Sequence, residues 1–123
     1  MGKPLKDVAE TYRAVGRLLV TPNGYVRLVF RVKTRAEVAA LCAVLPGAYT
    51  AHSKGQSSFS VCVARRSNLE AALTLLSEAC SADGALEPHE FALARACLRA
   101  SGAERLQAAA RLRRYTVRRP ALL

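Results

Sequence analysis

Acidic residues are scarce in this sequence, and their scarcity is the first constraint on its function. The 123 residues include 9 Asp and Glu against 19 Lys and Arg, so the formal net charge is +10 and the pI is about 10.2. Such an excess of positive charge favours phosphate-rich partners, either nucleic acid or an anionic membrane surface. No apolar run approaches the roughly 18 residues that a membrane span needs. Nucleic acid is therefore the better expectation.

The sequence also lacks the patterns of secretion, metal binding and covalent catalysis. Its first residues, MGKPLKDVAETY, contain no apolar signal core, and they are short for a transit peptide, although processing could have removed one. The cysteines and histidines are isolated, with no C-x-x-C pair: Cys42, Cys62, Cys80, Cys97, His52 and His89. No zinc site, Ser-His-Asp set or phosphate-binding loop can be assembled from them. We expect reduced thiols in an intracellular compartment, no metal and no cofactor.

Residues 25–33 carry the clearest pattern that is present, an alternation of apolar and charged side chains. Successive side chains of a strand point to opposite faces. One face of this strand is therefore apolar, and the other carries Tyr25, Arg27, Val29, Arg31 and Lys33.

The turn before this strand predicts a hairpin and its register. Pro22, Asn23 and Gly24 suit a three-residue loop with Gly24 in the left-handed position. Residues whose numbers sum to 46 then face each other: Leu18 and Leu28, Val20 and Val26, Arg17 and Val29, Arg13 and Lys33. A two-residue loop would turn Arg17 toward apolar partners, so we prefer the longer loop.

The rest of the pattern predicts an α+β fold. Capping boxes at Thr34/Glu37 and Ser67/Glu70 open two helices, and Pro88 opens a later one. The expected order is strands 13–21 and 25–33, a helix to Pro46-Gly47, strands 48–54 and 57–66, then helices. This is a four-stranded antiparallel sheet in ββαββα order with helices on one face, plus C-terminal helices and a basic tail. The divisions are a helical or irregular lead-in (1–12), the α+β domain (13–100), and a C-terminal helix with an arginine-rich tail (101–123).

The other sheet face would be open and basic. Its expected members are Arg13, Arg17, Arg27, Arg31, Lys33, Thr50, His52, Lys54, Ser58, Ser60 and Arg66. Like charges this close repel, so the face calls for a polyanion, although a solvated basic surface is the alternative. Tyr25 at the hairpin edge is a candidate to stack on a base, with edge packing as the alternative.

The C-terminal segment has two interpretations. It contains five arginines in nine residues: Arg111, Arg113, Arg114, Arg118 and Arg119. An extended basic arm along phosphates is favoured over a solvated helix end.

Five strings together resemble one known family. They are the hairpins RAVGRLLVTPNGYVRLVFRV and AYTAHSKGQSSFSVCVAR, and the helices TRAEVAALCAVLPG, SNLEAALTLLSEAC and LEPHEFALARACL. They resemble the LAGLIDADG homing-endonuclease fold over about residues 13–98. The resemblance implies that the antiparallel sheet is a saddle that contacts DNA.

The sequence departs from that family at its N-terminus. The family's name motif is an apolar helix with an acidic turn, which mediates pairing and supplies the carboxylate for the catalytic metal. Here the corresponding segment offers only Asp7 and Glu10, and neither lies in a glycine-flanked turn. Cleavage with two metals needs converging carboxylates. We therefore expect a binding sheet that has lost the catalytic and pairing helix.

These observations predict a non-catalytic nucleic-acid-binding protein, with RNA favoured, as a subunit of a ribonucleoprotein such as an organellar ribosome. Other protein subunits would then be partners, and a mitochondrion or chloroplast would be the compartment. One alternative is a protein–protein subunit or assembly factor. A second is a DNA-cleaving half whose metal acids come from a partner chain. A ligand-sensing βαββα domain is disfavoured by the extra leading strand.

Overall fold

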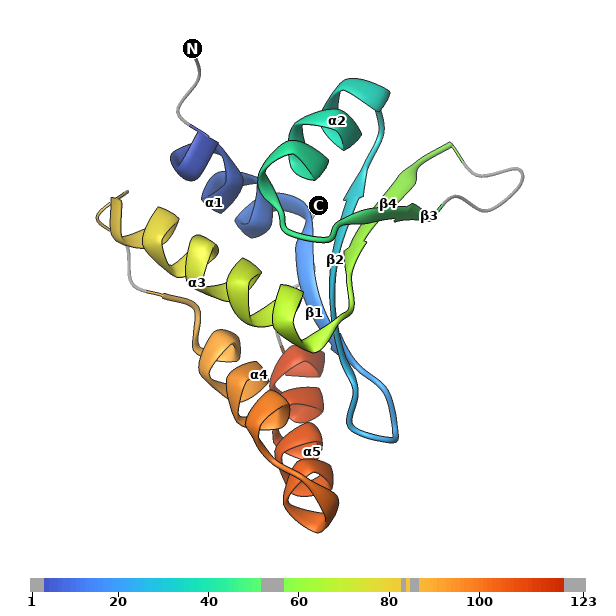
Figure 1. Cartoon of the computed structure of the whole chain (residues 1–123), viewed down its shortest axis with the longest axis vertical. Helices are drawn as coiled ribbons and strands as arrows, with labels where there is room; N and C mark the ends of the chain where they lie inside the picture. Colours follow the sequence, from blue (N-terminus) through green and yellow to red (C-terminus); the bar gives the residue numbers. More distant parts are fainter. Residues whose placement is uncertain (1–3, 52–56, 83, 85–86, 119–123) are drawn as a thin grey trace.

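The structure is a computed structural model that describes residues 4–51, 57–82, 84 and 87–118. The elements in chain order are α1 (Pro4–Val15), β1 (Gly16–Val20), β2 (Val26–Val32), α2 (Arg35–Val44), β3 (Tyr49–Ala51), β4 (Phe59–Val63), α3 (Arg66–Ala82), α4 (His89–Arg99) and α5 (Gly102–Arg118) (Figure 1). The predicted ββαββα order and the α+β class are confirmed. The helix α1 precedes them.

The strands form one antiparallel sheet in the order β1-β2-β4-β3. Helices α1, α2 and α3 lie on the same side of this sheet (Figure 1). On that side Leu28 and Phe30 of β2 and Val61 of β4 are fully buried. Leu69, Leu73 and Leu76 of α3 complete the same core. The core therefore lies between the helices and one sheet face.

The first hairpin has the predicted register. Leu18 lies opposite Leu28 and Arg17 opposite Val29, as the three-residue loop requires. The amide of Gly24 donates to the Thr21 carbonyl at 2.9 Å, and the Thr21 amide donates to the Tyr25 carbonyl at 2.8 Å. Gly24 has a φ of 89°, a left-handed conformation that glycine adopts without steric cost. Local turn chemistry was thus sufficient to set this strand pair.

The prediction that a strand begins at residue 13 was wrong, because α1 continues to Val15. Val8, Ala9 and Tyr12 are buried on one side of α1, at helical spacing. The ring of Tyr12 lies edge-on to Phe30 at 6.0 Å and to Phe91 at 5.0 Å, and its hydroxyl donates to Glu90 Oε2 at 2.5 Å. This packing holds the segment as a helix, so the lead-in of the sequence analysis is an ordered part of the core.

The two predicted capping boxes had different outcomes. Thr34 caps α2, accepting from the Glu37 amide at 3.1 Å while the Glu37 carboxylate accepts from the Thr34 amide at 3.0 Å. The second box was wrong, because α3 begins at Arg66 and Ser67 lies inside its first turn. The strand predicted to reach residue 66 ends at Val63.

The C-terminal arginine segment is helical through Arg118, so the favoured interpretation as an extended arm was wrong for the described residues. Ala108, Ala109 and Leu112 are buried, and α5 packs chiefly on α4. That apolar stripe stabilises the helix and leaves most of its arginines on the other side. Within the described part of the chain, no helix has the length and apolarity to span a membrane.

Candidate nucleic-acid interface

The side of the sheet away from the helices is the candidate interface, and we call it the open face. Strand alternation places Arg27, Val29 and Arg31 of β2 on this side, because Leu28 and Phe30 point into the core. Arg27 and Arg31 are both exposed, and Arg17 of β1 lies half-buried opposite Val29. The expectation that Arg27 and Arg31 share one uncovered face is confirmed.

The neighbouring strands add uncharged side chains to the open face. Arg31 lies opposite Ser60 of β4, and Val29 lies opposite Cys62. Tyr49 of β3 lies opposite Cys62 and is 45% exposed, and Leu19 of β1 lies opposite Arg27 and is 41% exposed. None of the described strand positions on this face is acidic. The face therefore has net positive charge and two exposed apolar side chains.

Cys62 shows how closely Arg27 and Tyr49 pack on the open face. It is only 3% exposed although it points away from the helices. Burial raises the pKa of the Cys62 thiol above its usual value, while the charge of Arg27 and a hydrogen bond with Tyr49 act in the opposite direction. The thiol therefore stays protonated at neutral pH, beneath a layer that includes an arginine and a tyrosine.

Lys33 lies next to an acidic side chain, that of Glu37. It is exposed directly after β2, but its amide donates to Glu37 Oε1 at 3.2 Å. The pKa of Glu37 is lowered, first by the side-chain hydrogen bond from Thr34 and also by the charge of Lys33. The basic centre of the interface is therefore Arg17, Arg27 and Arg31.

At the hairpin tip, Tyr25 is 59% exposed and belongs to a contact with α5. The guanidinium of Arg105 lies over its ring, with Cζ 4.8 Å from the centroid. Arg113 Nη2 also donates to the Thr21 carbonyl at 3.0 Å. Tyr25 is thus already stacked on one side, which leaves its other side for a ligand.

Several predicted site residues are not part of the open face. Arg13 lies on α1, where its Nη1 is 4.0 Å from Cys80 Sγ, so it cannot oppose Lys33. Arg66 opens α3, and Thr50 pairs with Val61 and so points to the helix side. The remaining arginines of the C-terminal segment that are described lie on α5: Arg111, Arg113, Arg114 and Arg118. The predictions for His52, Lys54 and Arg119 lie outside the described residues.

The sequence analysis missed Tyr49, Leu19 and Arg105. Leu19 could have been found from the hairpin register, since it must face Arg27. Tyr49 depends on the register of the second hairpin, where Tyr49 rather than Thr50 shares a face with Arg31. Arg105 reaches Tyr25 only through the packing of α5, for which no local signal exists.

The helix α1 occupies the segment before β1, where the sequence analysis expected a helix to have been lost. Its end is the position at which the family resemblance places an acidic turn. The residues there are Arg13, Ala14, Val15 and Gly16, without a carboxylate. Glu10, one helical turn earlier, is exposed. Among the described residues no group of three or more His, Cys, Asp or Glu could hold a metal ion.

Comparison with known proteins gives one relevant match. No protein-family model matches the sequence, and no curated protein does either. The fold is similar to that of an archaeal intron-encoded homing endonuclease, I-Vdi141I, solved in complex with DNA. The two align with a TM-score of 0.72 over 92% of this chain and 81% of the endonuclease chain, with 14% sequence identity. The chain therefore has a homing-endonuclease-like fold, as the resemblance implied.

Proposed function

We propose that this chain is a non-catalytic nucleic-acid-binding protein that uses the open face to bind phosphates. The observation that carries the proposal is the exposure of Arg27 and Arg31 on one uncovered sheet face, beside Arg17 and without an acid among the described strand positions. Guanidinium groups bind phosphate oxygens with paired, charge-assisted hydrogen bonds. The similar endonuclease was solved in complex with DNA, which supports nucleic acid as the polyanion.

RNA with unpaired bases is the ligand we favour. Tyr49 and Leu19 are exposed among the arginines, and Tyr25 is exposed at the hairpin tip. Aromatic side chains on a sheet stack on splayed, single-stranded bases, which duplex DNA does not present. A basic chain of this size with one such face is suited to a structural role in a ribonucleoprotein, such as an organellar ribosome.

The test is binding of the double variant Arg27→Glu/Arg31→Glu to a fluorescent RNA that contains an unpaired loop. We expect a loss of affinity on the order of a hundredfold, because two phosphate contacts are replaced by repulsion. The variant Arg27→Ala/Arg31→Ala should also make the negative slope of log K against log salt less steep by about 1.4, since each single-stranded phosphate contact contributes about 0.7. Circular dichroism should be unchanged for both variants.

A matched control separates the open face from net charge. Arg111→Glu/Arg114→Glu reverses the same number of charges as the open-face variant, at exposed positions on α5. Its loss should be about tenfold or less, because long-range charge contributes mainly to encounter. An equal loss for both pairs would refute the assignment to the open face. Competition by duplex DNA equal to that by looped RNA would refute the preference for RNA.

The absence of catalysis is part of the proposal and rests on the residues at the end of α1. Val15 and Gly16 stand where the family resemblance places a metal-binding carboxylate. A valine side chain can neither hold a divalent cation nor activate water.

The second candidate function is a DNA-cleaving half whose metal-binding acids come from a partner chain. The similarity to a homing-endonuclease chain, of which this chain covers 81%, favours it. Magnesium-dependent nicking of supercoiled DNA by purified protein, lost on Arg27→Glu/Arg31→Glu, would establish this candidate in place of the first.

A further inference from the structure

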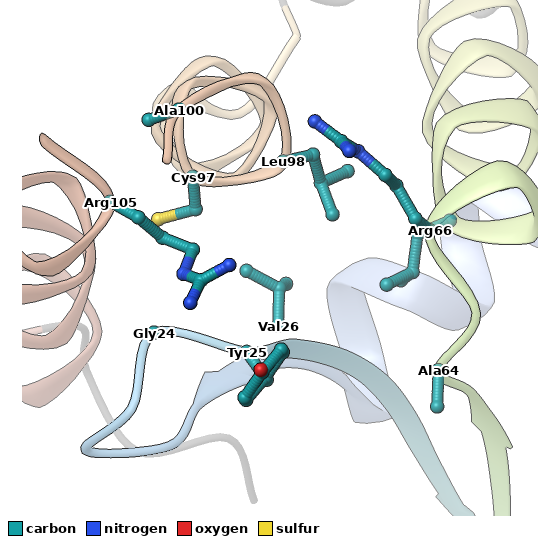
Figure 2. A pocket seen from close by; sticks show the side chains of 10 residues that line it. Gly24, Tyr25, Val26, Ala64, Arg66, Cys97, Leu98, Ala100 and Arg105 are labelled. Atoms are coloured by element: carbon teal, nitrogen blue, oxygen red, sulfur yellow. The ribbon is translucent and has the colours of Figure 1, made fainter. Parts of the chain in front are cut away.

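A cleft lies on the helix side of the hairpin tip, away from the open face. It has a volume of about 260 Å³ and lies between three parts of the chain. Gly24, Tyr25 and Val26 supply one wall, Ala64, Arg66 and Leu69 supply the second, and the corner between α4 and α5 supplies the third (Figure 2). Drug-sized ligands occupy pockets of roughly 300–1,000 Å³, so this cleft fits an organic ligand at the lower end of that size range.

Two arginines from different elements line the cleft. Arg66 comes from the first turn of α3 and Arg105 from α5, with Val26 and Leu98 between them (Figure 2). Neither has an ion-pair partner among the described residues. Two uncompensated guanidinium groups at one cleft favour an anion with several oxygen acceptors.

Arg105 is held in a fixed position by its neighbours. Its Nε is buried and has no hydrogen-bond partner within the described part of the chain. The accessible area of this atom is below 1 Å², so a ligand in the cleft can reach Arg105 only through its terminal Nη groups. Its guanidinium is held over the Tyr25 ring, 4.8 Å from Cζ to centroid. An added Cβ on Gly24 would approach Arg105 Cγ to 2.9 Å, so the glycine gives this side chain its place.

The interior of the cleft is apolar. Val26, Leu69 and Cys97 are buried, and Leu98 is 8% exposed. Burial raises the pKa of the Cys97 thiol, so the sulfur is neutral at physiological pH. An inorganic anion would gain little from these side chains, whereas a flat organic group would bury apolar surface against them.

We propose that this cleft binds a single nucleotide, with its phosphate between Arg66 and Arg105 and its base against Val26, Leu69 and Leu98. The cleft combines the two requirements of such a ligand, an anion site and an apolar slot of limited size. The inference rests on the cleft alone and holds whether or not the open face binds RNA.

The test is a calorimetric titration of the full chain with adenosine 5′-monophosphate, inorganic phosphate and adenosine. The nucleotide should bind at least about tenfold more tightly than either fragment, because each fragment fills half of the site. Arg105→Gln and Arg66→Gln should each weaken the nucleotide about tenfold through the loss of a charge-assisted contact. Arg66 is exposed, so its variant reports on binding even if Arg105→Gln lowers stability.

Two controls decide between this site and general attraction to a basic protein. Arg111→Gln and Arg114→Gln each remove one exposed charge elsewhere, on α5. Both should bind the nucleotide within about twofold of the unmodified chain. Equal weakening by Arg111→Gln, binding of phosphate as tight as that of the nucleotide, or no heat with any probe would each overturn the proposal.

Discussion

The two faces of strand β2 differ as much as any two regions of this molecule. On the helix side Val26, Leu28, Phe30 and Val32 are at most 4% exposed, whereas Arg27 and Arg31 on the other side are exposed. Both sets belong to one seven-residue strand, in which alternate side chains point to opposite faces of the sheet. Stability and the proposed binding therefore depend on different side chains of the same segment, and substitutions can separate them.

The largest effect should come from truncation of the inner face. Phe30 is fully buried and packs edge-on against Tyr12 at 6.0 Å. Phe30→Ala should lower the free energy of unfolding by about 3–5 kcal/mol, through lost burial and the cavity left behind. Urea denaturation measures this value. Arg31→Ala, its neighbour on the outer face, should change it by about 0.5 kcal/mol or less. Comparable losses in the two variants would abolish the distinction between the faces.

A sharper comparison uses the same substitution on each face. Val61 is fully buried on the helix side of β4, and Val29 is half-buried on the open face of β2. Valine and threonine have nearly the same shape and both suit strands. Val61→Thr should cost about 1–3 kcal/mol, because its hydroxyl is buried. Val29→Thr should stay within about 0.5 kcal/mol, since water can reach its hydroxyl. Thermal unfolding of both variants checks the difference, and equal shifts would contradict it.

The smallest expected effect is the contribution of the Glu87 carboxylate to the pH dependence of stability. The Glu87 carboxylate accepts hydrogen bonds from Arg95 of α4, at 3.0 Å, and from the hydroxyl of Ser77 in α3. The hydrogen bond from Arg95 lowers the pKa of Glu87 below 4.5, against an opposing effect of desolvation. Its stabilisation is therefore present above the pKa of the unfolded chain and is lost as pH falls through the lower folded value.

Glu87→Gln should accordingly make stability depend less on pH below about 4.5, with a cost near neutrality of less than about 1 kcal/mol, because the side chain is 33% exposed. Denaturant titrations of both proteins at pH 3 and pH 7 would show this. An unchanged acid dependence in the variant would assign the effect to other carboxylates, of which Glu37 also has a lowered pKa.

The first hairpin could be predicted because its information is local. Pro22, Asn23 and Gly24 determine the turn, and the alternation after them determines the face. Residues 13–15 could not be assigned in the same way, because a short segment can satisfy both helical and strand periods. Tyr12 resolves the ambiguity by packing against Phe91 and Glu90, which lie far away in the sequence.

The candidate site was predictable to a similar extent. Arg17, Arg27 and Arg31 follow from one register, whereas Tyr49 required the register of a second hairpin. The C-terminal arginines were misjudged because composition alone does not reveal the buried stripe of Ala108, Ala109 and Leu112. The cleft had no sequence signal, since Arg66 and Arg105 line one cleft only when three separate elements pack together.

The structure of the hairpin tip limits which substitutions this protein can accept. Gly24 and Tyr25 form a wall of the cleft and also lead into the strand that carries Arg27. Any side chain at position 24 would have to adopt a left-handed backbone and displace Arg105. A substitution at Gly24 or Tyr25 would therefore affect both the cleft and the strand that carries the open face. The two surfaces cannot evolve independently at these positions.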